Sequence, residues 1–572
     1  MSDAMFEQML RAARIGRLTR REVLERGLKL GMSTAAITAL MAAAPEVGAA
    51  PRSATLRMLT RSQDQTTGTF TIIGDEASPD LDPHSAYSNS AARILVGTHE
   101  TLIMLKGEST TEFNPVLAES WEASADNSTF TFKIPAGVTF QDGDPCTAES
   151  VRASFQRFLE MGMGPVNVIS RFMPDASMME VVDDQTITFN LGKPQPLFLS
   201  AMASAYGPFV LNTKYVDENK TDDDPWAHEF YLNGAPGSGT GPYMLTENEV
   251  TQQVTIEKFE GFHGGWDGPH FDKVVMRVVG EIATRRQLVE NGEGDALDQS
   301  LTPEDYEAMK TNPDLQVLSN PSTAVFWTIM NTPRLKSPGV KQGFSYAFPY
   351  DEIKDGVYKG LMTRSGPIAT AVRGHDPDVF IYQTDLAKAK ELILADGFAE
   401  GDTFEYTLAS EEATERSIAE LFQANIAEMG FALTIKELDS ASYNDMMYGD
   451  SPAEERPHFM GGWFWWPDYN DAWNQLYPNF AKASAGSAGS NAGYYSNDRL
   501  EEILAATEHF TDEAEYNTLM KEAQNILTEQ DPPVLYYGEA LWTTVLRKDI
   551  VGFEWNPLYM SQYPLHKMYR QS

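Results

Sequence analysis

A helix followed at once by a strand, between residues 414 and 438, constrains the fold of this chain more than any other feature. The stretch TERSIAELFQANIAEMG carries apolar residues at helical spacing, namely Ile418, Leu421, Phe422, Ile426 and Met429. The predicted helix ends at Gly430 and leads into the predicted strand FALTIKEL. Such a unit indicates α/β construction in the second half of the chain.

Other segments repeat this mixture of short strands and amphipathic helices. Residues 129–134 and 186–191 alternate as strands, and a helix is predicted over 148–161 with Thr147 as its N-cap. A further helix is predicted to begin at a Thr384 cap and to stop at Gly397. Because 572 residues exceed one ordinary hydrophobic core, two or three domains are expected.

The first fifty residues have the order of an export signal. Seven Lys/Arg lie before residue 30, and an apolar stretch and small residues follow. Arg20-Arg21 resembles a twin-arginine signal, but Val23 stands where phenylalanine is usual, so a Sec signal stays open. Cleavage near Ala49 or Ala50 and a periplasmic destination are predicted. The apolar stretch is too short for a membrane span, so the protein is not expected to be membrane-spanning.

Charge and cysteine content exclude several function classes. The formal charge of −38 repels phosphate backbones, so no nucleic-acid partner is expected. A single cysteine, Cys146, excludes an intrachain disulfide and a thiolate zinc cluster, and its position predicts a packed thiol. His263 and His270 bracket a Gly-rich loop seven residues apart, which is not a helical metal-ligand spacing. No nucleotide-binding, zinc-protease or nucleophile-elbow motif occurs, so no metal, cofactor or catalytic residue is predicted.

The most unusual stretch is GGWFWWPDYNDAWNQLY, residues 461–477, which holds four tryptophans beside Asp468 and Asp471. This pattern fits a catalytic carboxylate pair, the floor of a binding pocket, or a packed core. A retaining glycosidase holds two carboxyl groups about 5–5.5 Å apart on opposite sides of its substrate. Two residues of one loop rarely achieve this arrangement, so a secreted glycoside hydrolase using this pair is the remote alternative.

The order of several segments resembles the family 5 extracellular solute-binding proteins, the receptors of oligopeptide, dipeptide and nickel ABC importers. SPDLDPHSAYSNSA is similar to the Leu-Asp-Pro opening of that family, and residues 113–158 are similar to its longest signature. In family order there follow GTGPYML, NGEGDALD, VKQGFSYAFPYDEI, DLAKAKELILADGF, WFWWPDYND, LTEQDPPVLYYGEALW and VGFEWNP. The resemblance covers residues 67–560.

The resemblance implies a two-lobed periplasmic binding protein-like α/β fold of type II, in its large three-domain variety, with mixed sheets and a hinge. The domains would then be the signal 1–50, domain I in three parts (51–99, 231–325 and 531–572), domain II over 100–230, and domain III over 326–530 as the opposing lobe. The ligand would be trapped between the lobes when they close about the hinge. Periplasmic binding proteins are known to close around their ligands in this way.

The resemblance also implies site residues. In peptide-binding members, an aspartate in a segment similar to PDYND receives the α-ammonium group of the ligand, and this role falls on Asp468. A carboxylate enclosed between lobes needs a counter-charge, which a ligand ammonium supplies. The other ligand-binding positions carried over are Trp463, Trp465, Trp466, Tyr87, Asn89 and Asn491. Gly462 stands where some peptide receptors carry an arginine for the ligand carboxylate.

Structural roles compete with these assignments. Two of the four tryptophans are expected in the core, and Asp471 is expected to cap the helix that begins AWNQLY. The predicted function is a periplasmic, monomeric receptor that delivers a small peptide or another amine-bearing solute to the permease subunits of an ABC importer. A nickel complex, an opine-like conjugate or an oligosaccharide is the alternative ligand on the same scaffold.

Overall fold

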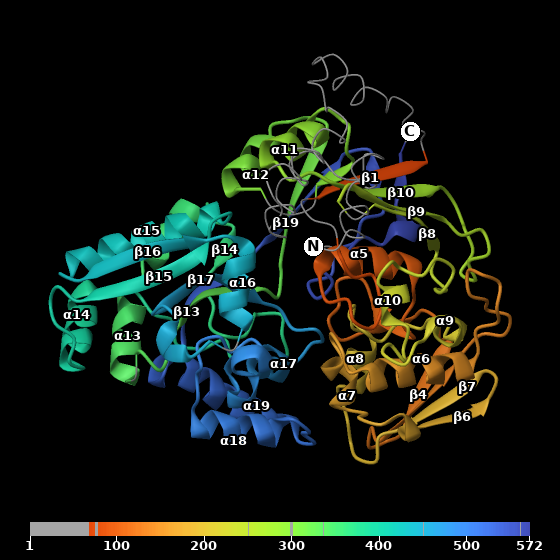
Figure 1. Ribbon diagram of the computed structural model, residues 1–572, viewed down its shortest axis with the longest axis horizontal. Helices are drawn as coiled ribbons and strands as arrows, with labels where there is room; N and C mark the ends of the chain where they lie inside the picture. The colour runs from red at the N-terminus through yellow and green to blue at the C-terminus, as the bar shows by residue number, and fades with distance from the viewer. Residues whose placement is uncertain are drawn as a thin grey trace, which may run out of the picture. The chain divides into compact units, whose positions relative to one another are not determined.

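The computed structural model describes residues 68–74, 78–249, 251–297, 301–335, 337–449, 451–560 and 562–571 (Figure 1). They belong to one compact unit, Thr67–Ser572. The predicted export signal, its arginine pair and its cleavage point lie outside the described residues. In the part of the chain that is described, no helix has the length and apolar character needed to cross a bilayer.

A seven-stranded mixed sheet forms the base of the first lobe. Its strands, in spatial order, are β12 (Leu315–Asn320), β19 (Trp542–Arg547), β11 (Ala296–Leu297), β1 (Thr69–Gly74), β10 (Lys273–Val278), β9 (Gln253–Lys258) and β8 (Tyr243–Glu249). The parallel pairs β1·β10 and β1·β11 lie at its centre, and the remaining pairs are antiparallel. Strands from three distant parts of the chain therefore build one sheet.

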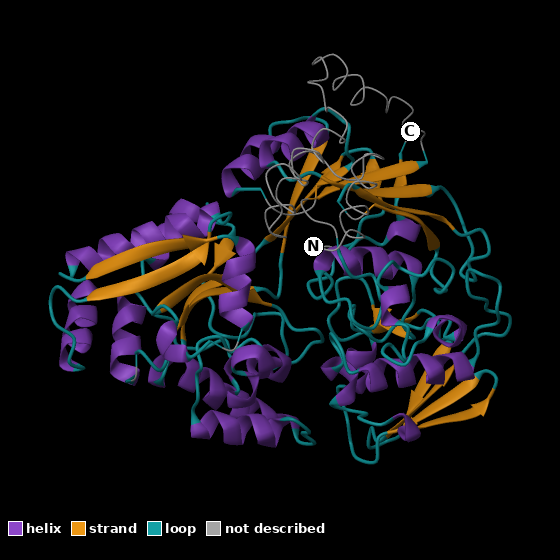
Figure 2. Cartoon of the chain, viewed as in Figure 1, coloured by secondary structure: helices purple, strands orange, loops and turns teal. Residues whose placement is uncertain are grey.

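A four-stranded antiparallel sheet and several helices complete the first lobe (Figure 2). The sheet has the order β4 (Ser120–Ala123), β5 (Thr129–Lys133), β7 (Thr186–Asn190) and β6 (Met179–Asp183). The helices are α5 (Asn89–Thr98), α6 (Ala148–Met161), α7 (Asn167–Ser170), α8 (Phe198–Met202), α9 (Lys214–Asn219), α10 (His228–Tyr231), α11 (Ile282–Glu290) and α12 (Pro303–Met309). Both strands predicted from alternation, β5 and β7, are confirmed.

A six-stranded mixed sheet forms the second lobe. Its order is β14 (Met362–Thr363), β18 (Val534–Ala540), β13 (Val325–Met330), β17 (Phe459–Trp465), β15 (Thr403–Ala409) and β16 (Ala432–Leu438). The helices are α13 (Pro338–Ala347), α14 (Leu386–Ala395), α15 (Ala413–Glu428), α16 (Ser440–Tyr448), α17 (Ala472–Phe480), α18 (Asp498–Thr507) and α19 (Glu513–Asn525). The predicted helix–strand unit is confirmed as α15 and β16, and β16 lies parallel to β15.

Two short connections join the large sheets. The chain leaves β12 at Asn320 and enters β13 at Val325, and it returns from β18 at Ala540 to β19 at Trp542. The Ser322 hydroxyl donates a hydrogen bond to the Ala540 carbonyl at 2.5 Å, so the two connections are tied together where they pass between the sheets. Hinges are typically a few residues at the ends of such elements. We propose this pair of connections as the hinge of the fold.

The position of β18 bears on the predicted domain boundaries. β18 pairs with β13 and β14, so a boundary at residue 531 would separate this strand from its own sheet. We therefore propose that domain III extends to about residue 540, where the returning hinge connection begins. The other boundaries remain predictions.

Local capping follows the sequence at two of three predicted helix starts. Thr147 caps α6 in a reciprocal arrangement with Ser150, and Asp471 caps α17 by accepting from the Trp473 N–H. The Thr384 cap was wrong, because Asp385 is the N-cap of α14 and accepts from the Lys388 N–H at 3.0 Å. The Thr384 hydroxyl instead donates to a carbonyl of another segment, since an adjacent carboxylate is the better acceptor for the helix N–H groups.

Candidate ligand-binding site

Strand β17 carries the aromatic segment between two neighbours. It pairs antiparallel with β13 and parallel with β15, so its side chains alternate between the two faces of the sheet. Trp463 is 8% exposed, whereas the next residue, Phe464, is 36% exposed. Trp473 is buried, and Trp465 and Trp466 are half-buried. The prediction that two of the four tryptophans are core is confirmed.

Asp468 follows β17 and reaches across to the first lobe. Its carboxylate Oδ1 accepts a hydrogen bond at 2.7 Å from the Tyr87 hydroxyl, although the two residues are 381 positions apart. Asn474 holds the aspartate from the other side, since its Oδ1 accepts from the Asp468 N–H at 2.6 Å and its Nδ2 donates to Oδ2 at 3.3 Å. Burial raises the pKa of Asp468 to about 6. No ion pair to Asp468 occurs among the described residues.

Tyr87 belongs to the first lobe and faces Asp468. Its side chain is 47% exposed, yet burial by the surrounding protein raises the pKa of its phenol well above the ordinary value, with further contributions from Asp468. The ring is thus surrounded by neighbouring protein and still reaches water. The ring packs edge-to-face on Tyr206 at 5.1 Å, and the Tyr206 hydroxyl donates to Asn89 Oδ1 at 3.0 Å. Tyr87, Asn89 and Asp468 are thus brought together.

Further aromatic rings pack on the segment that precedes Asp468. Phe464 stacks on Phe326 at 4.8 Å and on Trp466 at 5.5 Å, and Trp466 packs against Trp542. On the other side, Tyr448 is 45% exposed and its ring lies 5.5 Å from that of Trp463.

Trp465 is held by Asn474, the residue that also bonds Asp468. It donates its indole N–H to the Asn474 carbonyl at 3.3 Å and is half-buried. Asn491 is not part of this group, because it is 2% exposed and its side chain bonds the Ala481 and Tyr495 backbones.

Sequence reasoning missed three of these rings. Tyr206, Tyr448 and Phe326 lie outside the motifs that resemble the family; Tyr206 lies between α8 and α9, Tyr448 in α16 and Phe326 in β13. Tyr448 is the last residue of α16, whose buried residues are Tyr443 and Met447. An aromatic residue away from the buried face of this helix was the only signal in the sequence. Gly462 adopts φ of +81°, a conformation that side chains other than glycine disfavour, and an arginine there would be strained.

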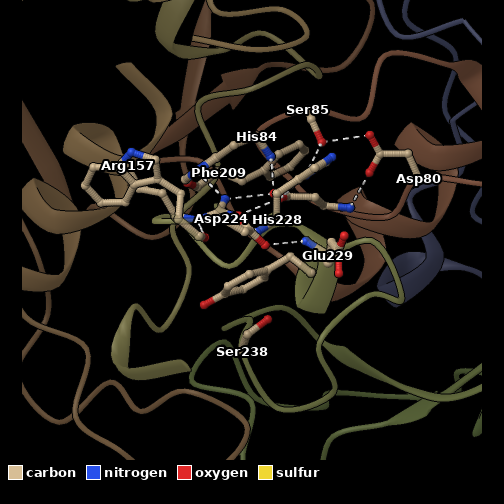
Figure 3. Close-up of polar contacts among 12 residues, drawn as sticks. Asp80, His84, Ser85, Arg157, Phe209, Asp224, His228, Glu229 and Ser238 are labelled. Atoms are coloured by element: carbon tan, nitrogen blue, oxygen red, sulfur yellow. Dashed lines mark hydrogen bonds and ion pairs between the residues drawn. The ribbon is translucent and has the colours of Figure 1, made fainter. Parts of the chain in front are cut away.

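A buried ion pair holds the Tyr87 loop in place (Figure 3). Arg157 of α6 donates two hydrogen bonds to Asp82, at 2.8 and 2.6 Å, and both side chains are fully buried. Arg157 Nη1 also lies 3.0 Å from His84 Nδ1, and His84 Nε2 lies 3.0 Å from the Phe209 carbonyl. Burial lowers the pKa of His84 to about 3, so the ring is neutral and accepts from the guanidinium. The bidentate pair anchors the Leu-Asp-Pro segment from which Tyr87 projects.

The same cluster contains serine, histidine and aspartate but lacks the geometry of a catalytic triad. Ser85 Oγ lies 3.3 Å from His228 Nδ1, and Asp82 Oδ2 lies 3.0 Å from the same nitrogen. In a triad the two partners bond opposite nitrogens of the ring, so that a proton can pass through it. Here they share one nitrogen, and no such relay exists.

Asp471 is unavailable to a substrate. Its side chain has no exposed surface, and its Oδ1 accepts from the Trp473 N–H and from the Tyr516 hydroxyl, both at 2.6 Å. Arg373 Nη1 lies 3.5 Å from Oδ2. The cap predicted for this residue is therefore confirmed, and a carboxylate pair with Asp468 on either side of a substrate is excluded by its burial.

Arg171 of the first lobe penetrates the second lobe beside this aspartate. Its guanidinium lies 3.8 Å from the centre of the Trp473 ring and donates to the Tyr469 hydroxyl at 2.5 Å and to the Glu508 carbonyl. Asn470 crosses the same interface, since its Nδ2 donates to the Thr110 carbonyl at 3.1 Å. The residues that follow Asp468 in the chain thus contact the first lobe.

Comparisons with known proteins decide the family. The family model for "Bacterial extracellular solute-binding proteins, family 5 Middle" matches residues 112–487, which is more than half of the chain. The chain belongs to this family.

Relatives of this family 5 solute-binding protein match most of its length. "Probable D,D-dipeptide-binding periplasmic protein DdpA" of Escherichia coli K12 is 26% identical over 506 residues, which are 87% of this chain and 93% of the relative. "Glutathione-binding protein GsiB" of Pectobacterium atrosepticum is 27% identical over 451 residues, 77% and 82% of the two chains.

A solved structure of DppA from Helicobacter pylori in complex with peptide STSA has a TM-score of 0.73 at 21% identity, and the match covers 88% of this chain and 98% of DppA. The predicted family, its α/β periplasmic binding protein fold and its role as a receptor of the ABC-importer type are confirmed. A periplasmic location agrees with the names of the relatives.

Proposed function

We propose that this family 5 protein captures a small peptide or another amine-bearing solute and that Asp468 receives the ligand ammonium group. One observation carries the proposal: the half-buried Asp468 carboxylate lies where the two lobes meet, beside aromatic rings, and bonds only neutral partners among the described residues. A carboxylate in such surroundings is unfavourable without a counter-charge. An ammonium group would supply this charge through a charge-assisted hydrogen bond.

The surrounding rings complete the recognition. Trp466 and Phe464 present faces that exclude water, and a cation gains from an aromatic face within about 6 Å. Tyr87 belongs to the first lobe and Asp468 to the second, so a ligand held by both favours the closed arrangement of the lobes. Micromolar binding corresponds to about 8 kcal/mol, which one ion pair, several hydrogen bonds and a few buried rings can supply.

The proposal includes delivery of the solute to permease subunits of an ABC importer, as a monomer without catalytic activity. The family and the relatives are binding proteins, and the serine–histidine–aspartate cluster of the described residues has no relay geometry. Export by a twin-arginine or Sec signal with cleavage near Ala49 or Ala50 is also part of the proposal. N-terminal sequencing of the protein purified from the periplasm tests this last point.

Calorimetry with a panel of di- and tripeptides, acetylated peptides, cello-oligosaccharides and chelated nickel tests the ligand class. Free-amine peptides should bind, and their N-acetylated forms should not. Asp468→Asn should abolish the difference, whereas Asp223→Asn removes the same charge from an exposed position and should leave it intact. Equal affinity for acetylated and free peptides, or binding of the uncharged sugars alone, would refute the assignment.

A further inference from the structure

A second cavity lies wholly within the first lobe. It has a volume of about 330 Å³ and is lined by five segments, 96–107, 114–116, 204–209, 262–264 and 554–567, together with Pro242. None of its lining residues belongs to residues 326–530, so it is separate from the site proposed at Asp468. Helix α5 has Asn89 at the cleft and Val96 and Gly97 at the cavity, and its ten residues span about 14 Å.

The Gly-rich loop that the sequence singled out forms one wall of this cavity. Phe262, His263 and Gly264 line it, and Gly265 turns the loop with φ of +71°. His263 Nε2 lies 2.7 Å from Glu100 Oε2, whereas the His270 ring packs on Trp266 at 4.4 Å. The two histidines are thus engaged with different partners and do not form a metal site.

The cavity is apolar with balanced charges. Its apolar and aromatic walls include Met104, Leu105, Phe209, Phe262, Tyr559 and Leu565. Glu100 pairs with His263, and Glu554 pairs with Lys567 at 3.1 Å. Burial lowers the pKa of His566 to about 4, so this ring is neutral. A charged ligand would meet no free counter-charge among these groups, and an uncharged one is favoured.

One polar group of the lining lacks a partner. Gln562 is 8% exposed, and its Oε1 atom is buried without a hydrogen bond in the described structure. Buried amide oxygens are nearly always bonded, because an unmet acceptor is costly. The atom has almost no accessible surface as it stands, so the amide has to turn toward the cavity before a donor of a bound molecule can satisfy it. Pockets for small molecules typically combine such apolar walls with a few polar groups and begin at about 300 Å³.

We propose that this cavity is a second ligand site, which takes an uncharged one- or two-ring aromatic molecule with one hydroxyl or N–H group. The rings pack between Phe209, Phe262 and Tyr559, and the donor bonds Gln562. Because the lining comes from one lobe, binding here is independent of lobe closure and of the ligand at Asp468. The site therefore goes beyond the proposed receptor function, and neither depends on the other.

Ligand-observed NMR and calorimetry with phenol, indole and toluene test the site on the purified protein. One saturable site is expected, with phenol about tenfold tighter than toluene, which lacks the donor. Gln562→Leu should remove this preference. Val116→Trp should fill the cavity and abolish binding, whereas Val182→Trp adds the same ring to an exposed position, 56% exposed in the native chain, and should not.

Circular dichroism checks the fold of each variant, and Asn114→Phe is a second filling variant should Val116→Trp unfold. Asp468→Asn should leave phenol binding unchanged. The proposal is overturned if phenol and indole show no saturation, if they still bind the filled variants, or if Asp468→Asn abolishes their binding, since the probes would then occupy the other cleft. Failure of the peptide assays leaves this outcome unaffected.

Discussion

Replacing Asp468 by asparagine should stabilise the free protein and weaken the binding of the ligand. Burial raises the pKa of Asp468 from 3.8 to about 6, so the folded protein binds a proton more tightly at this site than the unfolded chain does. A group with a raised pKa contributes stability that is fully present below 3.8 and is lost as the pH rises through about 6. The ionised carboxylate that the proposed function requires is therefore a destabilising element in the free protein.

The magnitudes follow from this pKa. The difference between the folded and unfolded pKa corresponds to about 3 kcal/mol of unfolding free energy at most. Because solvent reaches the half-buried side chain, the effect is smaller, and Asp468→Asn should raise the unfolding free energy by about 1–3 kcal/mol at pH 7.5. The gain should vanish near pH 4. For the ligand, only the ionised form binds an ammonium group well. At pH 5 about a tenth of the carboxylates are ionised, so the dissociation constant should rise about tenfold between pH 7 and pH 5.

Two measurements check both halves. Urea unfolding of both proteins at pH 4, 5.5 and 7.5 gives the stability difference, and calorimetry with a free-amine peptide at pH 5 to 7 gives the affinity. The variant should bind weakly and without pH dependence. A wild-type affinity that is constant from pH 5 to 7, or an asparagine variant less stable than wild type at pH 7.5, would contradict the reasoning.

Three other changes should have distinct effects. Arg157→Met leaves Asp82 buried without its partner and should cost about 3–5 kcal/mol of unfolding free energy, measured by urea denaturation, with a smaller loss when both are replaced by apolar residues. Glu415 has a pKa that burial raises to about 7, so wild type should lose stability by up to about 1.4 kcal/mol per pH unit between pH 4.5 and 7, and Glu415→Gln should flatten this slope. Arg171→Ala should increase the rate of ligand release in stopped-flow experiments. Arg171→Lys should not restore the slow release, because lysine cannot stack on Trp473 and bond two oxygens at the same time. An unchanged release rate would show that this contact does not hold the lobes together.

Local patterns predicted the elements that depend on local physics. Alternation identified β5 and β7, helical spacing identified α6 and α15, and small polar residues identified two of three caps. Arg157 escaped this reasoning although it lies on the buried face of α6. A charged side chain is usually exposed, and the cost of burying Arg157 is offset by its ion pair with Asp82, which is distant in the sequence.

The site was predicted in part for the same reason. Asp468 and Tyr87 were each identified through a motif, but their hydrogen bond depends on how the lobes meet, which no local pattern encodes. Tyr206, Tyr448 and Arg171 have no motif, and they join the site only because the elements that carry them converge there.

The quoted motifs predict the family better than the ligand because their residues build the scaffold behind the cleft. Gly239 and Gly241 lie so close to Thr98 that a Cβ on either would approach its backbone within 3 Å, and the Gln141 side chain donates to the carbonyls of Thr98 and Gly241. These contacts hold the end of α5, as the Asp82 ion pair holds its beginning. A motif whose residues pack against one another determines where the cleft walls stand. In the proposed function, the chemistry of the ligand then depends on the few side chains that those motifs do not hold in the scaffold, Asp468 first among them.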